Sequence, residues 1–180
     1  LTVAEHLSRG QVYFDNRQFP QSREHFTKIL DLFPNDPAMS GALFLTGRSY
    51  YWEREYARAI PFLDRASREF PATKDGREGL YFKGACNVRI GKNAEAAKIY
   101  EQYTVMYPTG ERIDGSYLNA IDALREAGFS RSDRRKGIAI FRKLLLPYGG
   151  AAGPEPREED TAADMVASLE RAAERIRASQ

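Results

Sequence analysis

The sequence has little of what most catalytic, metal-binding or membrane-spanning proteins need. Its 180 residues include one cysteine and two histidines, and no apolar run reaches the roughly 18 residues of a membrane span. A single cysteine excludes an internal disulfide and a cysteine-rich metal site. A mean hydropathy of −0.56 and 29% charged residues are typical of a soluble chain. A net charge of +2 is too small to indicate nucleic-acid binding.

The few residues that could carry chemistry are not arranged for it. For His6 and His25, packing is a better interpretation than a metal ligand or a general base. Cys86 lies in a helical pattern, as a small buried thiol would. The segment GACNVRIGKN has the wrong spacing for a phosphate loop, and Gly91 within it is expected in a turn with positive φ. We therefore predict no catalytic residue, no metal site and no cofactor.

Sliding the sequence against itself reveals a repeat of 37 residues. Three successive units share a glycine, a small residue, a large residue and an aromatic–proline pair in register. The glycine, small, large and proline columns are Gly10, Gly47 and Gly84; Ser22, Ala59 and Ala96; Phe26, Leu63 and Tyr100; and Pro34, Pro71 and Pro108. So many aligned columns do not arise by chance, so the repeat is real.

Each unit has the pattern of two helices. In the second unit, apolar residues recur at helical spacing over residues 38–52 and again over residues 56–70, with a polar break between. Small residues in the glycine and alanine columns let the two helix axes approach closely. A pair of this size cannot bury its apolar stripe alone, so we expect neighbouring pairs to stack.

These patterns predict an all-α solenoid with one repeat domain over residues 1–148. Its units span about 3–37, 40–74 and 77–111, and a worn fourth unit spans 113–148, where a longer turn shifts the columns. Residues 149–160 have the composition of a linker. Residues 161–180 are predicted to form a helix that covers the last repeat with a polar outer face.

The column pattern resembles the tetratricopeptide repeat. The residues that carry the resemblance are Gly10, Tyr13, Ser22, Phe26 and Pro34 in the first unit and Gly47, Tyr50, Ala59, Leu63 and Pro71 in the second. The resemblance covers roughly residues 3–147, and it departs from the family in its period, which is 37 residues instead of the usual 34. It implies a right-handed solenoid in which the first helix of each pair lines a concave groove.

Carried over by position, the resemblance predicts a partner-binding groove rich in aromatic residues. Its predicted residues are Gln11, Phe14, Asp15, Phe44, Arg48, Tyr51, Trp52, Tyr81 and Arg89. Leu7, Glu78, Ala85 and Val88 share the same columns. Aromatic residues and arginine are enriched at binding hot spots, so the groove is expected to bind a peptide or helix of a partner protein. In the alternative interpretation, Phe44 and Tyr81 pack between repeats and only Tyr51 and Trp52 reach solvent.

Two other kinds of partner are disfavoured. Chaperone-tail receptors of the family hold a terminal carboxylate with Lys, Asn and Arg, but the corresponding positions here are Leu7, Gln11, Leu45, Glu78 and Phe82. The densest basic cluster, RSDRRKG at residues 131–137, lacks interleaved aromatic residues and is expected to be a solvated loop.

The long period and the aromatic–proline endings are similar to repeats of the bacterial cell envelope. Such repeats occur in a lipoprotein of β-barrel assembly, in the coordinator of the Tol–Pal system and in the superhelical stalk of soluble lytic transglycosylases. The stretch YPTGERIDGSYLNAIDALREAG resembles the stalk type. This similarity implies a periplasmic or envelope location, with the cytoplasm as the alternative. The chain begins with Leu1 and without a signal segment, so we expect a mature or trimmed form.

The function predicted from the sequence is a non-catalytic protein-interaction scaffold. The first alternative is that the chain is the stalk of a larger lytic transglycosylase whose catalytic domain lies elsewhere, and the second is a lipoprotein with a lipid anchor upstream of Leu1. The sequence does not predict an oligomeric state.

Overall fold

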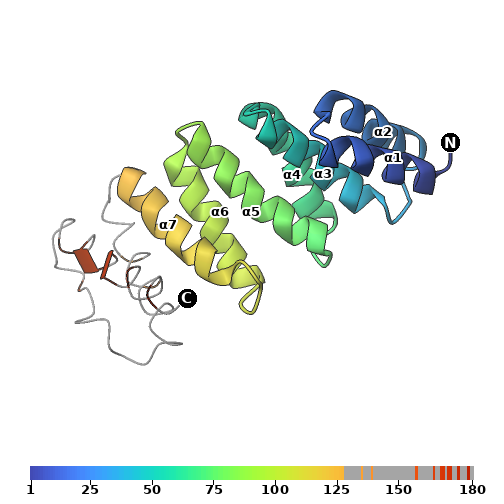
Figure 1. Cartoon of the computed structure of the whole chain (residues 1–180). Coiled ribbons are helices and arrows are strands. Elements are labelled where there is room, and N and C mark those ends of the chain that lie inside the picture. Colours follow the sequence, from blue (N-terminus) through green and yellow to red (C-terminus); the bar gives the residue numbers. More distant parts are fainter. Residues whose placement is uncertain are drawn as a thin grey trace. The chain divides into compact units, whose positions relative to one another are not determined.

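The computed structural model describes residues 1–127 and isolated positions between 135 and 178. Residues 1–127 contain seven α-helices and no strand (Figure 1). The helices are α1 (Val3–Asp15), α2 (Phe19–Leu32), α3 (Met39–Trp52), α4 (Tyr56–Glu69), α5 (Lys74–Arg89), α6 (Asn93–Met106) and α7 (Ile113–Ala127). The all-α prediction is therefore confirmed. The second half of the fourth unit, the linker and the C-terminal helix lie outside the continuously described residues.

The chain divides into two compact units. The first, Leu1–Gly91, contains α1–α5, and the second, Lys92–Gln180, contains α6 and α7. In the first unit each helix packs against the next one, and α3 also packs against α5. In the second unit α6 packs against α7. The predicted repeat domain of residues 1–148 thus contains a boundary at the turn of its third helix pair.

The turn inside each pair uses a left-handed backbone conformation at the same column of the repeat. Arg17, Arg54 and Gly91 have φ of 59°, 65° and 76°, and they are 37 residues apart. The sequence predicted this conformation for Gly91, where glycine adopts it without steric cost. At Arg17 and Arg54 the same turn forms with a Cβ present, which indicates that packing of the two helices imposes the turn.

The glycine column brings the two helices of a pair into close contact. A Cβ added at Gly10 would lie 2.5 Å from the Phe26 ring, and one added at Gly47 would lie 2.7 Å from Leu63 Cγ. The Ser22 hydroxyl donates a hydrogen bond of 2.8 Å to the Gly10 carbonyl. The predicted role of the small residues is therefore confirmed for the first two pairs.

The aromatic–proline pairs end the second helix of each unit in one conformation. The preceding aromatic residues Phe33, Phe70 and Tyr107 are the C-caps of α2, α4 and α6, with φ of −132°, −130° and −131°. Proline disfavours the helical conformation in the residue before it, so the helix ends there. This confirms the local part of the repeat prediction.

The core is built from the large residues of the repeat columns. Phe26 and Leu63 are fully buried, in two neighbouring clusters of the first unit. Tyr100 is buried in the second unit. Cys86 is a buried free thiol, and burial raises its pKa to about 12. The prediction of a small buried thiol is therefore confirmed. No helix within the described residues is long and apolar enough to cross a membrane.

Candidate functional site

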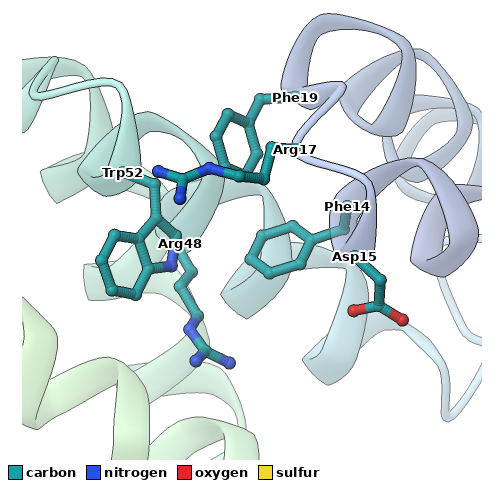
Figure 2. Close-up of a pocket in the computed structure, with 6 residues that line it drawn as sticks. All are labelled: Phe14, Asp15, Arg17, Phe19, Arg48 and Trp52. Carbon is teal, nitrogen blue, oxygen red and sulfur yellow. The ribbon is translucent and has the colours of Figure 1, made fainter.

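A pocket of about 320 Å³ opens where the first two repeats meet. Phe14 and Asp15 from the end of α1 line it, as do Arg17 from the following turn and Phe19 from the start of α2, and Arg48 and Trp52 from α3 complete the lining (Figure 2). All six residues belong to the first compact unit. The pocket therefore lies where the end of α1 and the turn after it meet the last turns of α3.

Aromatic rings form the walls of the pocket. The Phe14 and Phe19 rings meet edge to face with centroids 5.4 Å apart, and both residues are more than nine-tenths buried. Trp52 is 47% exposed, so much of its indole is open to a ligand. Figure 2 shows the Phe14 ring and the Trp52 indole on opposite sides of the pocket. The phenylalanines therefore provide a fixed apolar wall and Trp52 an accessible one.

Arg48 is held among three phenyl rings from three helices. Its guanidinium carbon lies 5.6 Å from the centroid of Phe14 on α1, 5.8 Å from that of Phe44 on α3 and 5.7 Å from that of Phe82 on α5. The negative faces of aromatic rings attract a cation at such distances. Nε of Arg48 is buried and has no hydrogen-bond partner among the described residues. Arg48 is thus surrounded by aromatic rings, and its Nε–H group has no hydrogen-bond acceptor among the described residues.

The charges lining the pocket are unbalanced. Two arginines, Arg17 and Arg48, and one carboxylate, Asp15, line it. The amide of Gln11 donates a hydrogen bond of 2.8 Å to that carboxylate. Neither arginine forms an ion pair with a carboxylate that the structure describes. The pocket therefore carries one excess positive charge.

The nine predicted groove residues fall into three groups. Phe14, Asp15, Arg48 and Trp52 line the pocket, and Gln11 holds Asp15. Phe44 is 6% exposed and packs against Phe82, so it belongs to the core between α3 and α5. The prediction of Phe44 as a binding residue is corrected accordingly, because a ring inside a helix contact offers no surface.

Tyr51, Tyr81 and Arg89 do not line the pocket. Tyr51 is half-buried against Phe82 and Tyr56, with ring centroids 5.1 Å and 5.4 Å away. Tyr81 is half-buried beside Phe82 on α5, and Arg89 is exposed at the end of α5. The predicted set of nine is therefore a pocket plus its surroundings, not one continuous row.

Sequence reasoning missed Arg17 and Phe19 as lining residues. Both lie at the turn of the first pair, outside the helix columns carried over from the family. Phe19 has a signal in the sequence, because it matches Tyr56 in the repeat. Arg17 matches Arg54 at the turn column, but this match does not indicate that the side chain reaches toward Trp52, as Figure 2 shows.

The two histidines form a pair outside the pocket. His6 Nδ1 and His25 Nδ1 are 3.0 Å apart, and the Tyr13 ring stacks on His25 with centroids 5.6 Å apart. His6 is 7% exposed. Burial lowers the pKa of His6, and so do His25 and the nearby positive charges of the N-terminus, Lys28 and Arg9. The pair joins α1 to α2, and no group of three or more metal-ligating side chains is present among the described residues.

Comparisons with known proteins identify the repeat. The family model of the tetratricopeptide repeat matches residues 7–73. A comparison with curated protein sequences gave no match. Among solved structures, a Podospora anserina protein named as a kinesin light chain with nearly identical TPR-like repeats superposes with a TM-score of 0.60 at 11% identity, covering 99% of this chain and 90% of that one.

A second similar structure is the TPR2AB domain of yeast Sti1 in its complex with pHSP90. It superposes with a TM-score of 0.58 at 19% identity, covering 94% of this chain and 73% of that one. At such identities the likeness concerns the fold. Tetratricopeptide repeats generally mediate protein–protein interaction and are non-catalytic. Residues 7–73 therefore match the tetratricopeptide repeat family, and the all-helical fold is similar to that of solved tetratricopeptide-repeat structures.

Proposed function

We propose that this protein is a non-catalytic interaction module that binds a peptide or helix of a partner protein in the pocket between its first two repeats. The observation that carries the proposal is the combination of a half-exposed Trp52, a rigid wall of Phe14 and Phe19, and the unpaired Arg48 in one pocket. Tryptophan and arginine are the residue types that most often dominate binding energy.

The proposed partner differs in chemistry from a partner that is held by the family's carboxylate clamp. The yeast Sti1 domain binds pHSP90 with the same fold. In this chain, however, the positions of the family's carboxylate clamp hold Leu7, Gln11, Leu45, Glu78 and Phe82. Leucine and phenylalanine cannot donate hydrogen bonds to a carboxylate, and Glu78 would repel one. A co-chaperone role is therefore disfavoured.

The bacterial cell envelope is the proposed location. Its support is the 37-residue period with aromatic–proline endings, which is similar to envelope repeats. The alternative role, as the stalk of a lytic transglycosylase, draws on the stretch between Tyr107 and Gly128. Sequencing the gene beyond Gln180 separates the two, because a stalk continues into a lysozyme-like domain.

Selection of a random phage-displayed peptide library on the full chain tests the binding function. We expect peptides that bind the wild type and bind Trp52→Ala about tenfold or more weakly, since removing a central tryptophan costs about 2 kcal/mol or more at a hot spot. Leu32→Ala is the matched control, because Leu32 is 61% exposed on α2 and lies outside the pocket.

Affinities are measured by fluorescence polarisation with labelled synthetic peptides, and circular dichroism verifies that each variant is folded. Failure of the library to yield binders, or equal affinity for the wild type and Trp52→Ala, contradicts the proposal.

A further inference from the structure

Arg48 is the least satisfied polar group of the pocket. Its Nε is buried without a hydrogen-bond partner among the described residues. The three phenyl rings around it attract the positive charge but cannot accept hydrogen bonds as an oxygen does. A buried unpaired donor on a charged group costs free energy that a suitable acceptor recovers. The site is therefore prepared for an acceptor from outside the chain.

The acceptor that fits best is an anion. The pocket has an excess of one positive charge, and Asp15 is already held by Gln11. The planar guanidinium offers donors in a fork that matches the two oxygens of a carboxylate. Because three rings fix the guanidinium, little conformational entropy is lost when the anion binds.

Of the two inter-repeat sites within α1–α5, the first has this chemistry and the second does not. The residue that corresponds to Arg48 in the next repeat is Ala85, 37 positions later. Where the first site has Asp15 and Trp52, the second has Trp52 and Arg89 at the same columns. The positive charge at the Arg48 column therefore marks one place on the surface instead of a general feature of the repeats.

The surroundings of Arg48 indicate that the anion is an acidic side chain within a partner peptide and not the carboxylate at the peptide's C-terminus. Apolar rings lie on both sides of the guanidinium, with Phe14 and Phe19 toward the first pair and Phe82 toward α5. A peptide that crosses the pocket can place apolar groups on either side of its acidic residue. None of the five clamp positions holds a cation of the kind that binds a chain terminus in the family.

We propose that the pocket recognises an internal acidic side chain of the partner peptide next to a large apolar one, with Arg48 binding the carboxylate and Trp52 packing on the apolar group. The proposal rests on the proposed function and deepens it, because it names the partner's chemistry. In this proposal Arg48 recognises the charge of the peptide, and Phe14, Phe19 and Trp52 recognise the shape of its apolar side chain.

Defined probe peptides test this inference. Three acetylated and amidated decapeptides of glycine and serine carry a central Glu-Phe, Gln-Phe or Glu-Ala pair, and a fourth has no acidic side chain but a free C-terminal carboxylate after Phe. Binding is followed by NMR on the ¹⁵N-labelled full chain, through the Arg48 Nε–Hε and Trp52 indole signals. We expect Glu-Phe to shift both signals and to bind at least about tenfold more tightly than Gln-Phe and Glu-Ala.

Protein variants provide the complementary measurement. Arg48→Gln should weaken binding of the Glu-Phe peptide about tenfold and abolish its preference over Gln-Phe. Arg9→Gln, which removes an exposed charge of α1 outside the pocket, should leave both unchanged. Comparing the two peptides on the unaltered wild type keeps the test valid even where Arg48→Gln fails to fold.

Three outcomes overturn the inference. They are equal affinity for Glu-Phe and Gln-Phe, Glu-Phe binding that leaves the Arg48 signal in place, and tighter binding of the free C-terminal carboxylate than of the internal acid. Library peptides that depend on Trp52 but contain no acidic residue would also overturn it while leaving the proposed function intact. A library without any binder contradicts the proposed function itself.

Discussion

At the scale of single residues, Arg48 is where the structure most changes the expectation from sequence. The groove columns suggest a surface arginine whose replacement leaves stability nearly unchanged. Instead its guanidinium is enclosed by Phe14, Phe44 and Phe82, and Nε is buried. Arg48 therefore contributes to the packing of three helices as well as to the pocket.

We expect Arg48→Glu to destabilise the first unit by about 1–3 kcal/mol, because a carboxylate would face the negative faces of the rings without a hydrogen-bond donor. Urea unfolding followed by circular dichroism measures the change. Arg9→Glu is the matched control, since it reverses an exposed charge on α1. Equal stability of the Arg48→Glu variant and the wild type would show that Arg48 is free to leave the rings.

The left-handed turns give a second prediction at this scale. We expect Arg54→Gly to stabilise the protein by about 1 kcal/mol, because φ of 65° strains a residue with a Cβ and suits glycine. Arg54 is exposed and does not line the pocket, so peptide binding should not change. Arg54→Ala, compared in the same urea titration, should give no such gain. An equal gain for alanine would assign the effect to loss of the arginine side chain.

At the scale of helices, the glycine column sets the distance between partners in a pair. We expect Gly47→Leu to cost about 1–3 kcal/mol, since its Cβ would already lie 2.7 Å from Leu63 Cγ before the rest of the side chain is added. Thermal unfolding gives the comparison. Gly41→Ala, whose Cβ would meet only the far end of Asp75 at 3.5 Å, is the matched control on the same helix. A Gly47→Leu protein as stable as the control would contradict close packing of α3 on α4.

The histidine pair makes the contact between α1 and α2 sensitive to pH. The pKa of His6 is lowered in the folded state from its ordinary value of 6.5, mainly by burial and by His25. Below pH 6.5 His6 is therefore protonated more readily in the unfolded chain than in the folded one. We expect the free energy of unfolding to fall as pH drops from 7.5 to 5. Urea midpoints across this range measure the loss.

Between pH 7.5 and 5 the effect of His6 on stability can be distinguished from that of Glu5 and Asp64. The pKa values of Glu5 and Asp64 are lowered from 4.5 and 3.8, so these groups stay ionised throughout it. In His6→Leu the dependence on pH should be much weaker. If this variant loses as much stability as the wild type does, another group is responsible.

Some contacts between these helices could be predicted from the sequence and others could not. A fixed register of 37 residues predicted that the glycine column lets the two helices of a pair approach closely, and Gly10 beside Phe26 and Gly47 beside Leu63 show this approach. It did not predict that His6 would meet His25, since that contact depends on the rotamers of two side chains on different helices. Local patterns also cannot distinguish a buried Phe44 from an open Trp52 on the same helix face.

At the scale of the whole molecule, the repeats are similar in backbone but different in surface. The turns at Arg17, Arg54 and Gly91 and the helix ends before the three prolines follow one 37-residue register. The pocket beside Arg48 is not repeated in the next pair of the described residues, because Ala85 occupies the equivalent position there. The backbone of such a protein can therefore be predicted from the repeat, whereas a binding site must be sought in the departures from it.

The position of Trp52 has a practical consequence for optical measurements. It is the single tryptophan of the chain, it is 47% exposed, and it lines the pocket. Indole emission shifts to shorter wavelengths when water around the ring is replaced by apolar groups, and indole can be excited at wavelengths where the ten tyrosines hardly absorb. The unlabelled protein thus carries its own fluorophore at the place where a partner would dock.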